Sequence, residues 1–104
     1  MEILTGIRAK VLGNEFEYSQ HALDQAVLRD ISVPELREAI ANAELIGDYP
    51  NDKYGPSCLL LGFTAKGRPL HIQTSYPSRQ RLKVITVYEP DPGLWIEFRG
   101  RRNP

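Results

Sequence analysis

The sequence predicts an α+β fold in which two to three N-terminal helices pack on one side of a mostly antiparallel sheet of four to five strands. Three observations predict this fold class. Apolar residues follow a helical spacing up to residue 43, an extended and β-branched pattern follows from residue 44, and short glycine and proline turns separate the extended segments. Because 104 residues suffice for one core, we expect a single domain over residues 1–104.

The first candidate helix covers residues 2–12. Its helical spacing predicts one buried face, formed by Leu4, Ile7 and Val11. Gly13 follows directly and favours termination of the helix. The alternating segment 15–18 then predicts a short strand.

Two further helices are expected before the strands. Ser19 is a suitable N-cap for a helix over residues 20–29. That helix places three polar side chains along one face, namely His21, Gln25 and Arg29. We expect the helix to pack on the domain through a neighbouring apolar stripe, which comprises Ala22, Ala26, Leu23 and Val27. The sequence Ser32-Val33-Pro34-Glu35 is a capping box with proline in the first turn and begins the next helix, whose apolar face is Leu36, Ala39, Ile40 and Ala43.

The rest of the chain has the pattern of extended strands. The candidate segments are residues 45–49, 58–63, 69–75, 82–88 and 94–98, separated by turns rich in proline, glycine and asparagine. The second of them is continuously apolar, which is typical of a strand covered on both faces. In the strand over residues 82–88, strict alternation places Thr86 and Tyr88 on one face with Val84, opposite Ile85 and Val87.

The formal net charge of zero hides a division between the two halves of the chain. Residues 1–52 carry ten acidic and four basic side chains, whereas residues 53–104 carry three acidic and nine basic ones. Between Asp52 and Glu89 there is no carboxylate, and the basic residues there are Lys53, Lys66, Arg68, Arg79, Arg81 and Lys83. Such a surface suits an anionic partner, most commonly a phosphate backbone. The alternative is that the acidic half simply packs beside the basic half.

The cysteine content and the hydropathy of the chain indicate its cellular compartment and its cofactors. Cys58 is the single cysteine, so no intrachain disulfide can form and a reducing compartment is favoured. Its apolar surroundings indicate a packed thiol and not a nucleophile. Two histidines and one cysteine, widely spaced, form no zinc motif, so we expect neither a metal nor another cofactor. No apolar stretch approaches about 18 residues and no signal peptide is evident, which predicts a cytoplasmic chain without membrane contact.

Several short motifs, in order along the chain, resemble one family. They are Ser19-x-His21-Ala22, Arg29-x-Ile31-Ser32, Gly-Arg-Pro-Leu-His at residues 67–71, and Val84-Ile85-Thr86-Val87-Tyr88-x-Pro90. The resemblance covers residues 15–98 and is to the bacterial domain of unknown function 4258, a family similar in layout to the RelE and BrnT ribonuclease toxins. It implies a toxin–antitoxin type domain that acts as a metal-independent RNA endonuclease. RNA and an antitoxin-like protein are the implied partners.

One position departs from the family pattern. The family's helix usually reads His-x-x-x-Arg-x-x-x-Arg, whereas this chain has Gln25 in the middle position. A glutamine cannot neutralise a phosphate or the charge of a transition state. The alternative function is therefore a non-catalytic nucleic-acid- or protein-binding module that keeps the fold without the chemistry.

Metal-free RNA cleavage requires a base, an acid and cations on the phosphate. The candidates for base and acid are His21 and His71, whose side chains would flank one substrate if the helix face of the first met the sheet face of the second. Arg29 is the candidate cation, and the further basic candidates are Arg68, Arg79, Arg81 and Lys83. The alternative is that each histidine makes a hydrogen bond between helix and sheet and nothing more.

Aromatic residues supply the remaining candidates. Tyr88 could donate a hydrogen bond to a phosphate or stack on a base, and Thr86 shares its face. Half-buried packing in the sheet is the plainer role for such a tyrosine. We expect Tyr54 and Tyr76 at exposed strand ends, where the aromatic and basic residues from 76 to 81 could form a platform for nucleic acid.

Overall fold

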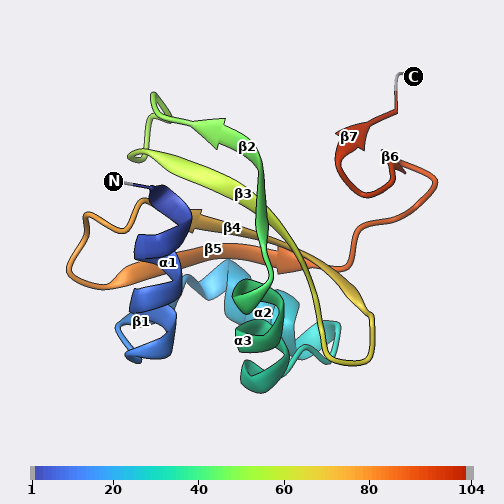
Figure 1. The fold of residues 1–104 in the computed structure, drawn as a ribbon, viewed down its shortest axis with the longest axis horizontal. Coiled ribbons are helices and arrows are strands. Elements are labelled where there is room, and N and C mark those ends of the chain that lie inside the picture. The colour runs from blue at the N-terminus through green and yellow to red at the C-terminus, as the bar shows by residue number, and fades with distance from the viewer. Residues whose placement is uncertain (1, 103–104) are drawn as a thin grey trace.

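The computed structural model describes residues 2–102 and has the α+β architecture that the sequence predicts. Its helices are α1 (Ile3–Leu12), α2 (Gln20–Leu28) and α3 (Val33–Ala41). Its strands are β1 (Phe16–Tyr18), β2 (Glu44–Tyr49), β3 (Ser57–Phe63), β4 (Pro69–Ser75), β5 (Leu82–Tyr88), β6 (Trp95–Ile96) and β7 (Gly100–Arg101). Figure 1 shows the helices gathered below and in front of the main sheet, with the β6–β7 hairpin standing apart from them at the upper right.

The main sheet has five strands in the order β1-β5-β4-β3-β2. Strands β2 to β5 form an antiparallel meander, because each is joined to the next by a short turn. Strand β1 lies at the edge and pairs in parallel with β5, with Phe16 opposite Leu82. Strands β1 and β5 can pair in parallel because the chain between them is long, with helices α2 and α3 and three strands.

The core lies between the helices and one face of this sheet. Its largest members from the helices are Ile7, Val11, Leu36 and Ile40, and those from the strands are Leu60, Leu70, Ile72, Leu82, Val84 and Val87. Because side chains alternate along a strand, the intervening residues lie on the opposite face, which we call the outer face. The outer face includes Leu59 and Leu61 of β3, His71 and Gln73 of β4, and Thr86 and Tyr88 of β5.

Side-chain caps fix where the helices begin. The Ser19 hydroxyl accepts a hydrogen bond from the amide of Ala22 at 3.0 Å and donates one to the carbonyl of Ile85 at 2.7 Å, which attaches the start of α2 to β5. Ser32 and Glu35 form the predicted capping box at the start of α3. The two expected helix starts are therefore confirmed.

A β-bulge in β5 changes which of its residues face the core, compared with the faces that strict alternation predicts. Gln73 pairs with Thr86 and the next residue, Thr74, pairs with Val84, so Ile85 is an extra residue on β5. The bulge shifts the alternation by one position. Val84 is consequently fully buried in the core and does not share the face of Thr86 and Tyr88, as strict alternation had predicted.

Two other expectations are wrong. Leu23 and Val27 are 44% and 75% exposed, because α2 approaches β5 through the small side chains of Ala22 and Ala26 and the larger residues lie beyond this contact. The segment 94–98 does not extend the main sheet. Only Trp95 and Ile96 are strand residues, and they pair with β7 in a separate hairpin. None of the helices in residues 2–102 is long and apolar enough to cross a membrane.

Candidate functional site

The two histidines do not converge on one site. His71 lies between the core residues Leu70 and Ile72 of β4, so its side chain is on the outer face. Helix α2, which carries His21, packs on the opposite face of the sheet through Ala22 and Ala26. The sheet therefore separates the two imidazoles, and the acid–base pair expected from the sequence is not formed.

His71 is instead fully buried and bonded on both sides of its ring. Its Nε2 atom lies 2.6 Å from the carbonyl oxygen of Phe98, and its Nδ1 atom lies 3.0 Å from the hydroxyl of Tyr88. Because a carbonyl can only accept, Nε2 carries the proton and Nδ1 accepts from Tyr88. Burial lowers the pKa of His71, and the hydrogen bond to Phe98 opposes this effect. The ring is therefore a neutral structural group, but its partners are the adjacent strand and the β6–β7 hairpin and not a helix, as the plainer of the two roles had supposed.

The outer residues of β5 differ in how much they are engaged. The hydroxyl of Tyr88 is taken up by His71, and burial raises the pKa of this tyrosine. Thr86 lies opposite Gln73 and is half-buried on the same face. Tyr88 is thus part of the packing of the sheet, whereas Thr86 retains access to solvent.

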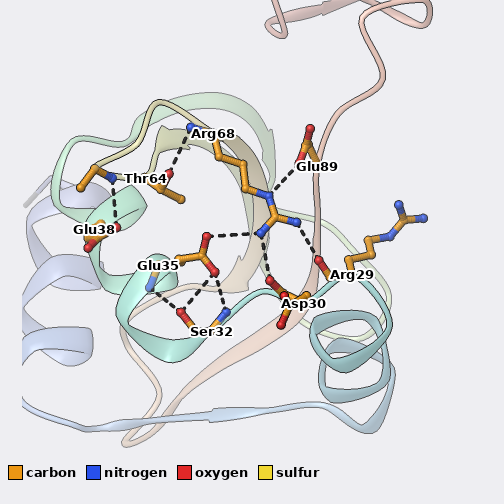
Figure 2. A network of polar contacts seen from close by, with 9 residues as sticks. Arg29, Asp30, Ser32, Glu35, Glu38, Thr64, Arg68 and Glu89 are labelled. Carbon is orange, nitrogen blue, oxygen red and sulfur yellow. Dashed lines mark hydrogen bonds and ion pairs between the residues drawn. The ribbon is translucent and has the colours of Figure 1, made fainter.

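Helix α2 presents its polar stripe to solvent. The guanidinium Nε of Arg29 donates to the side-chain oxygen of Gln25 at 2.9 Å. His21, which lies one turn before Gln25, is exposed. Gln25 thus holds the Arg29 side chain along the helix. Figure 2 shows this guanidinium pointing away from the neighbouring polar network, to which Arg29 contributes its backbone carbonyl.

Arg68 is the centre of that network (Figure 2). It donates to the carboxylate of Glu89 at 2.7 Å, to that of Glu35 at 3.3 Å, and to the carbonyls of Asp30 at 3.0 Å and Arg29 at 2.7 Å. These acceptors come from the end of α2, the first turn of α3 and the residue after β5. Most of the donors of the Arg68 guanidinium are thus used internally, which makes it a clamp between segments and a poor candidate for a phosphate ligand.

Other cations are engaged in the same way. Arg81 lies 3.4 Å from Glu17 and donates to the carbonyl of Phe16 at 2.8 Å, which holds β1 beside the start of β5. Arg99 forms two hydrogen bonds to the carboxylate of Glu44. Together with the Arg68–Glu35 pair, these contacts join the basic half of the chain to the acidic half. The plainer explanation of the charge division therefore accounts for these three arginines.

Arg79 and Lys83 are not explained in this way. Within residues 2–102 neither forms an ion pair with a carboxylate. Both line a cleft of about 490 Å³ at the end of the sheet where β3 begins, β4 ends and β5 begins. The cleft is also lined by Asp52, Tyr54, Gly55, Pro56, Ser75, Tyr76, Ser78 and Ile85. The β2–β3 and β4–β5 connections, with the adjoining end of β4 and start of β5, thus bring two cations and two tyrosines together.

The electrostatics of the cleft favour an anion. Asp52 is its one carboxylate and accepts a hydrogen bond from the Ser57 hydroxyl at 3.1 Å. Tyr54 is 87% exposed, and the ammonium of Lys53 lies 4.9 Å from the centre of its ring, which brings a third cation near the rim. The cleft therefore offers positive charge beside an aromatic ring with a solvent-accessible face. No histidine is among its lining residues.

Tyr76 contributes to the wall of the cleft with its phenol already bonded. The hydroxyl donates to the carboxylate of Asp48, and this hydrogen bond is the main cause that raises the pKa of Tyr76 to about 12. The phenol consequently stays protonated at neutral pH and cannot act as a base. It fixes the position of the β4–β5 connection against β2.

A family model described as "Domain of unknown function (DUF4258)" matches residues 18–89, which is more than half of the chain. The chain belongs to this family. No curated protein and no solved structure matches the chain. The cleft residues from Asp52 to Ile85 lie within the DUF4258 domain, whereas the β6–β7 hairpin follows the matched region.

Two further features of the DUF4258 domain are its histidine, cysteine and acidic side chains as possible metal ligands, and its thiol. Among residues 2–102 no group of three histidine, cysteine or acidic side chains lies close enough together to hold a metal ion. Cys58 is buried and lies 3.6 Å from the Thr74 hydroxyl, and burial raises the pKa of its thiol. It packs in the core, as its apolar surroundings predict.

Proposed function

We propose that this DUF4258 domain binds RNA in the cleft, with Arg79 and Lys83 on phosphate groups and Tyr54 stacked on a base. The observation that carries the proposal is the pair of cations without carboxylate partners that face one cleft beside an exposed aromatic ring. Cationic grooves with exposed aromatic rings are the usual design for single-stranded nucleic acid, because every base has a face that can stack.

The composition of the cleft suits RNA in particular. Ser78 supplies an exposed hydroxyl group beside the cations, and a hydroxyl can both donate to and accept from a ribose 2′-hydroxyl. The volume of about 490 Å³ falls within the range of small-ligand sites and suits one or two nucleotides and not a duplex. Single-stranded RNA is therefore the class of ligand that we propose.

The geometry favours binding over cleavage. A RelE- or BrnT-like endonuclease needs an acid and a base within reach of the scissile phosphate. His21 and His71 are on opposite sides of the sheet, and the tyrosine whose hydroxyl faces Asp48 keeps its proton. We therefore propose the non-catalytic module and not the toxin-type endonuclease.

Binding is tested with a fluorescently labelled single-stranded RNA at low salt. Arg79→Ala and Lys83→Ala should each weaken binding about tenfold, since each removes a charged hydrogen bond to phosphate. Lys66→Ala is the matched control, because Lys66 is an exposed lysine in the β3–β4 turn and lies outside the cleft. Absence of binding by the unaltered protein, or an equal loss in the Lys66 variant, would overturn the proposal.

Cleavage is tested separately, by incubating the protein with total RNA and with ribosome-bound message in the absence of metal. The proposal predicts intact RNA both for the unaltered protein and for His21→Ala. RNA that is cut by the unaltered protein and spared by His21→Ala would establish an endonuclease and contradict the non-catalytic assignment.

A second candidate function, protein binding, is favoured by the exposed side chains of Leu23 and Val27. Together with Val33, these residues line a groove of about 370 Å³. Asp30 also lines this groove and gives it a negative charge. The groove fits an amphipathic helix with basic flanks, as an antitoxin-like partner could provide. A helical peptide of leucine and lysine is the probe. It should shift the backbone amide resonances of these residues and bind Val27→Ser more weakly. If the peptide leaves the resonances of Leu23 and Val27 unchanged, this groove is not a peptide-binding site.

A further inference from the structure

The β6–β7 hairpin rests on the outer face of the sheet, at the end opposite to the cleft. The carbonyl of Phe98 accepts from His71, and the ring of Phe98 meets that of Phe63 edge-to-face with 6.4 Å between centroids. Arg99 reaches Glu44 on β2 at 2.7 Å. The hairpin is thus attached to β2, β3 and β4 by a few side-chain contacts, without joining their ladder.

The turn of this hairpin has an unfavourable backbone. Glu97 and Phe98 have φ angles of 51° and 64°, so two consecutive non-glycine residues are left-handed. Tight hairpin turns of this kind normally contain asparagine, aspartate or glycine. The hairpin strands have only two residues each, and Ile96 remains 51% exposed. The contacts with the outer face therefore hold a conformation that so short a hairpin would not keep by itself.

The surface beneath the hairpin and the cleft lie on the same face of β5. Lys83, Thr86 and Tyr88 all lie on the outer face of β5, and the first of them lines the cleft while the last bonds His71 beneath the hairpin. Five residues of extended chain separate the two ends, a distance of about 16 Å. An RNA strand bound in the cleft could follow β5 directly toward His71.

The groups that the hairpin places there resemble those of a nucleobase. Phe98 presents a carbonyl oxygen to the Nε2–H of His71 and an aromatic ring to Phe63. A base such as uracil or guanine presents the same two features, a carbonyl acceptor and a flat ring. The site beneath the hairpin can thus recognise a base once Phe98 has left it.

We propose that the β6–β7 hairpin is a displaceable cap on a second RNA subsite, in which a base replaces Phe98 on His71 and Phe63. The inference rests on the proposed function, because the same RNA strand would occupy the cleft. It adds that the hairpin, which lies beyond the family-matched region, competes with RNA and sets the affinity of the full chain.

Two variants of the full chain should change the stability of the closed hairpin in opposite directions. Phe98→Ala removes the ring contact and should tighten RNA binding about twofold to tenfold, since the closed state loses an aromatic pair. Glu97→Asn suits the left-handed backbone and should weaken RNA binding. The second variant removes a negative charge, which by itself would favour RNA, so weaker binding cannot arise from charge. Trp95 is the single tryptophan and lies 4.4 Å from His71, so its fluorescence reports release of the hairpin.

The outcomes separate the cap from the cleft. Tighter binding by Phe98→Ala with a changed Trp95 emission, together with weaker binding by Glu97→Asn, supports the cap. Equal or weaker binding by Phe98→Ala, while Arg79→Ala still weakens binding, overturns the cap and leaves the cleft. Absence of RNA binding by every variant at low salt overturns both. Circular dichroism checks that Phe98→Ala is folded. If Phe98→Ala unfolds, the binding of Glu97→Asn still decides the test.

Discussion

The imidazole of His71 donates from Nε2 to the carbonyl of Phe98 over 2.6 Å and thereby joins the centre of the sheet to the C-terminal hairpin. The edge-to-face contact between His71 and Trp95, with 4.4 Å between ring centres, reinforces this connection. Because burial lowers the pKa of His71, the folded chain favours the neutral ring. The protonation of His71 is therefore coupled to folding.

Acidification should destabilise the protein through His71. An unfolded histidine has a pKa of about 6.5, and the folded value is lower, so the unfolded state takes up the proton first as the pH falls. The contribution of His71 to the free energy of unfolding is complete above about pH 6.5 and decreases below it. Urea unfolding between about pH 7.5 and pH 5 measures this decrease, which should be absent in His71→Gln. A stability that rises over the same interval would contradict the assignment.

Arg68→Ala should lower the free energy of unfolding by about 2–3 kcal/mol, because charged hydrogen bonds to three separate segments are lost together. Arg68→Lys should recover only part of this loss, since an ammonium cannot reproduce the planar fork. Arg81→Ala is the control, and its largely exposed pair with Glu17 predicts a loss of less than about 1 kcal/mol. Urea unfolding followed by circular dichroism measures all three. Equal losses in the Arg68 and Arg81 variants would show that the network is not a clamp.

Gly62→Ala should be strongly destabilising. A β-carbon at this position of β3 would lie 2.0 Å from the carbonyl oxygen of Ala39, so the backbone of α3 would have to move away from the sheet. We expect a loss of about 3 kcal/mol or more in thermal or urea unfolding, at the upper end of the range for overpacking. Gly100→Ala has no neighbouring atom within 4 Å of the new β-carbon and serves as the control. A Gly62 variant as stable as the Gly100 variant would refute the close approach of α3 to β3.

Local signals in the sequence account for much of the fold. The Ser32 capping box predicts the start of α3, and the β-branched run predicts the limits of β5, because both depend on residues close together in the chain. The bulge at Ile85 was not predictable from alternation, since it arises from the pairing of β5 with β4. The exposure of Leu23 and Val27 likewise depends on how closely α2 approaches β5.

The candidate site was predictable only in part. The basic run identifies Arg79 and Lys83 but does not distinguish them from Arg68 and Arg81, whose partners come from distant segments. Tyr54 was expected in an exposed loop, but its meeting with Arg79 requires two connections that are more than twenty residues apart to lie together. The hydrogen bond between His71 and Phe98 depends on a turn whose left-handed residues carry no glycine or asparagine signal.

The salt dependence of RNA binding tests the central claim most directly. The logarithm of the association constant is measured against that of the salt concentration for the unaltered protein, the Arg79→Ala/Lys83→Ala double variant and the Lys66→Ala control. If both cleft cations contact phosphates, the slope for the unaltered protein should be steeper than that of the double variant by about 1.4, or about 0.7 per contact. Lys66→Ala should keep the steep slope. An identical slope for the unaltered protein and the double variant, or binding that ignores salt, would contradict the proposed RNA site.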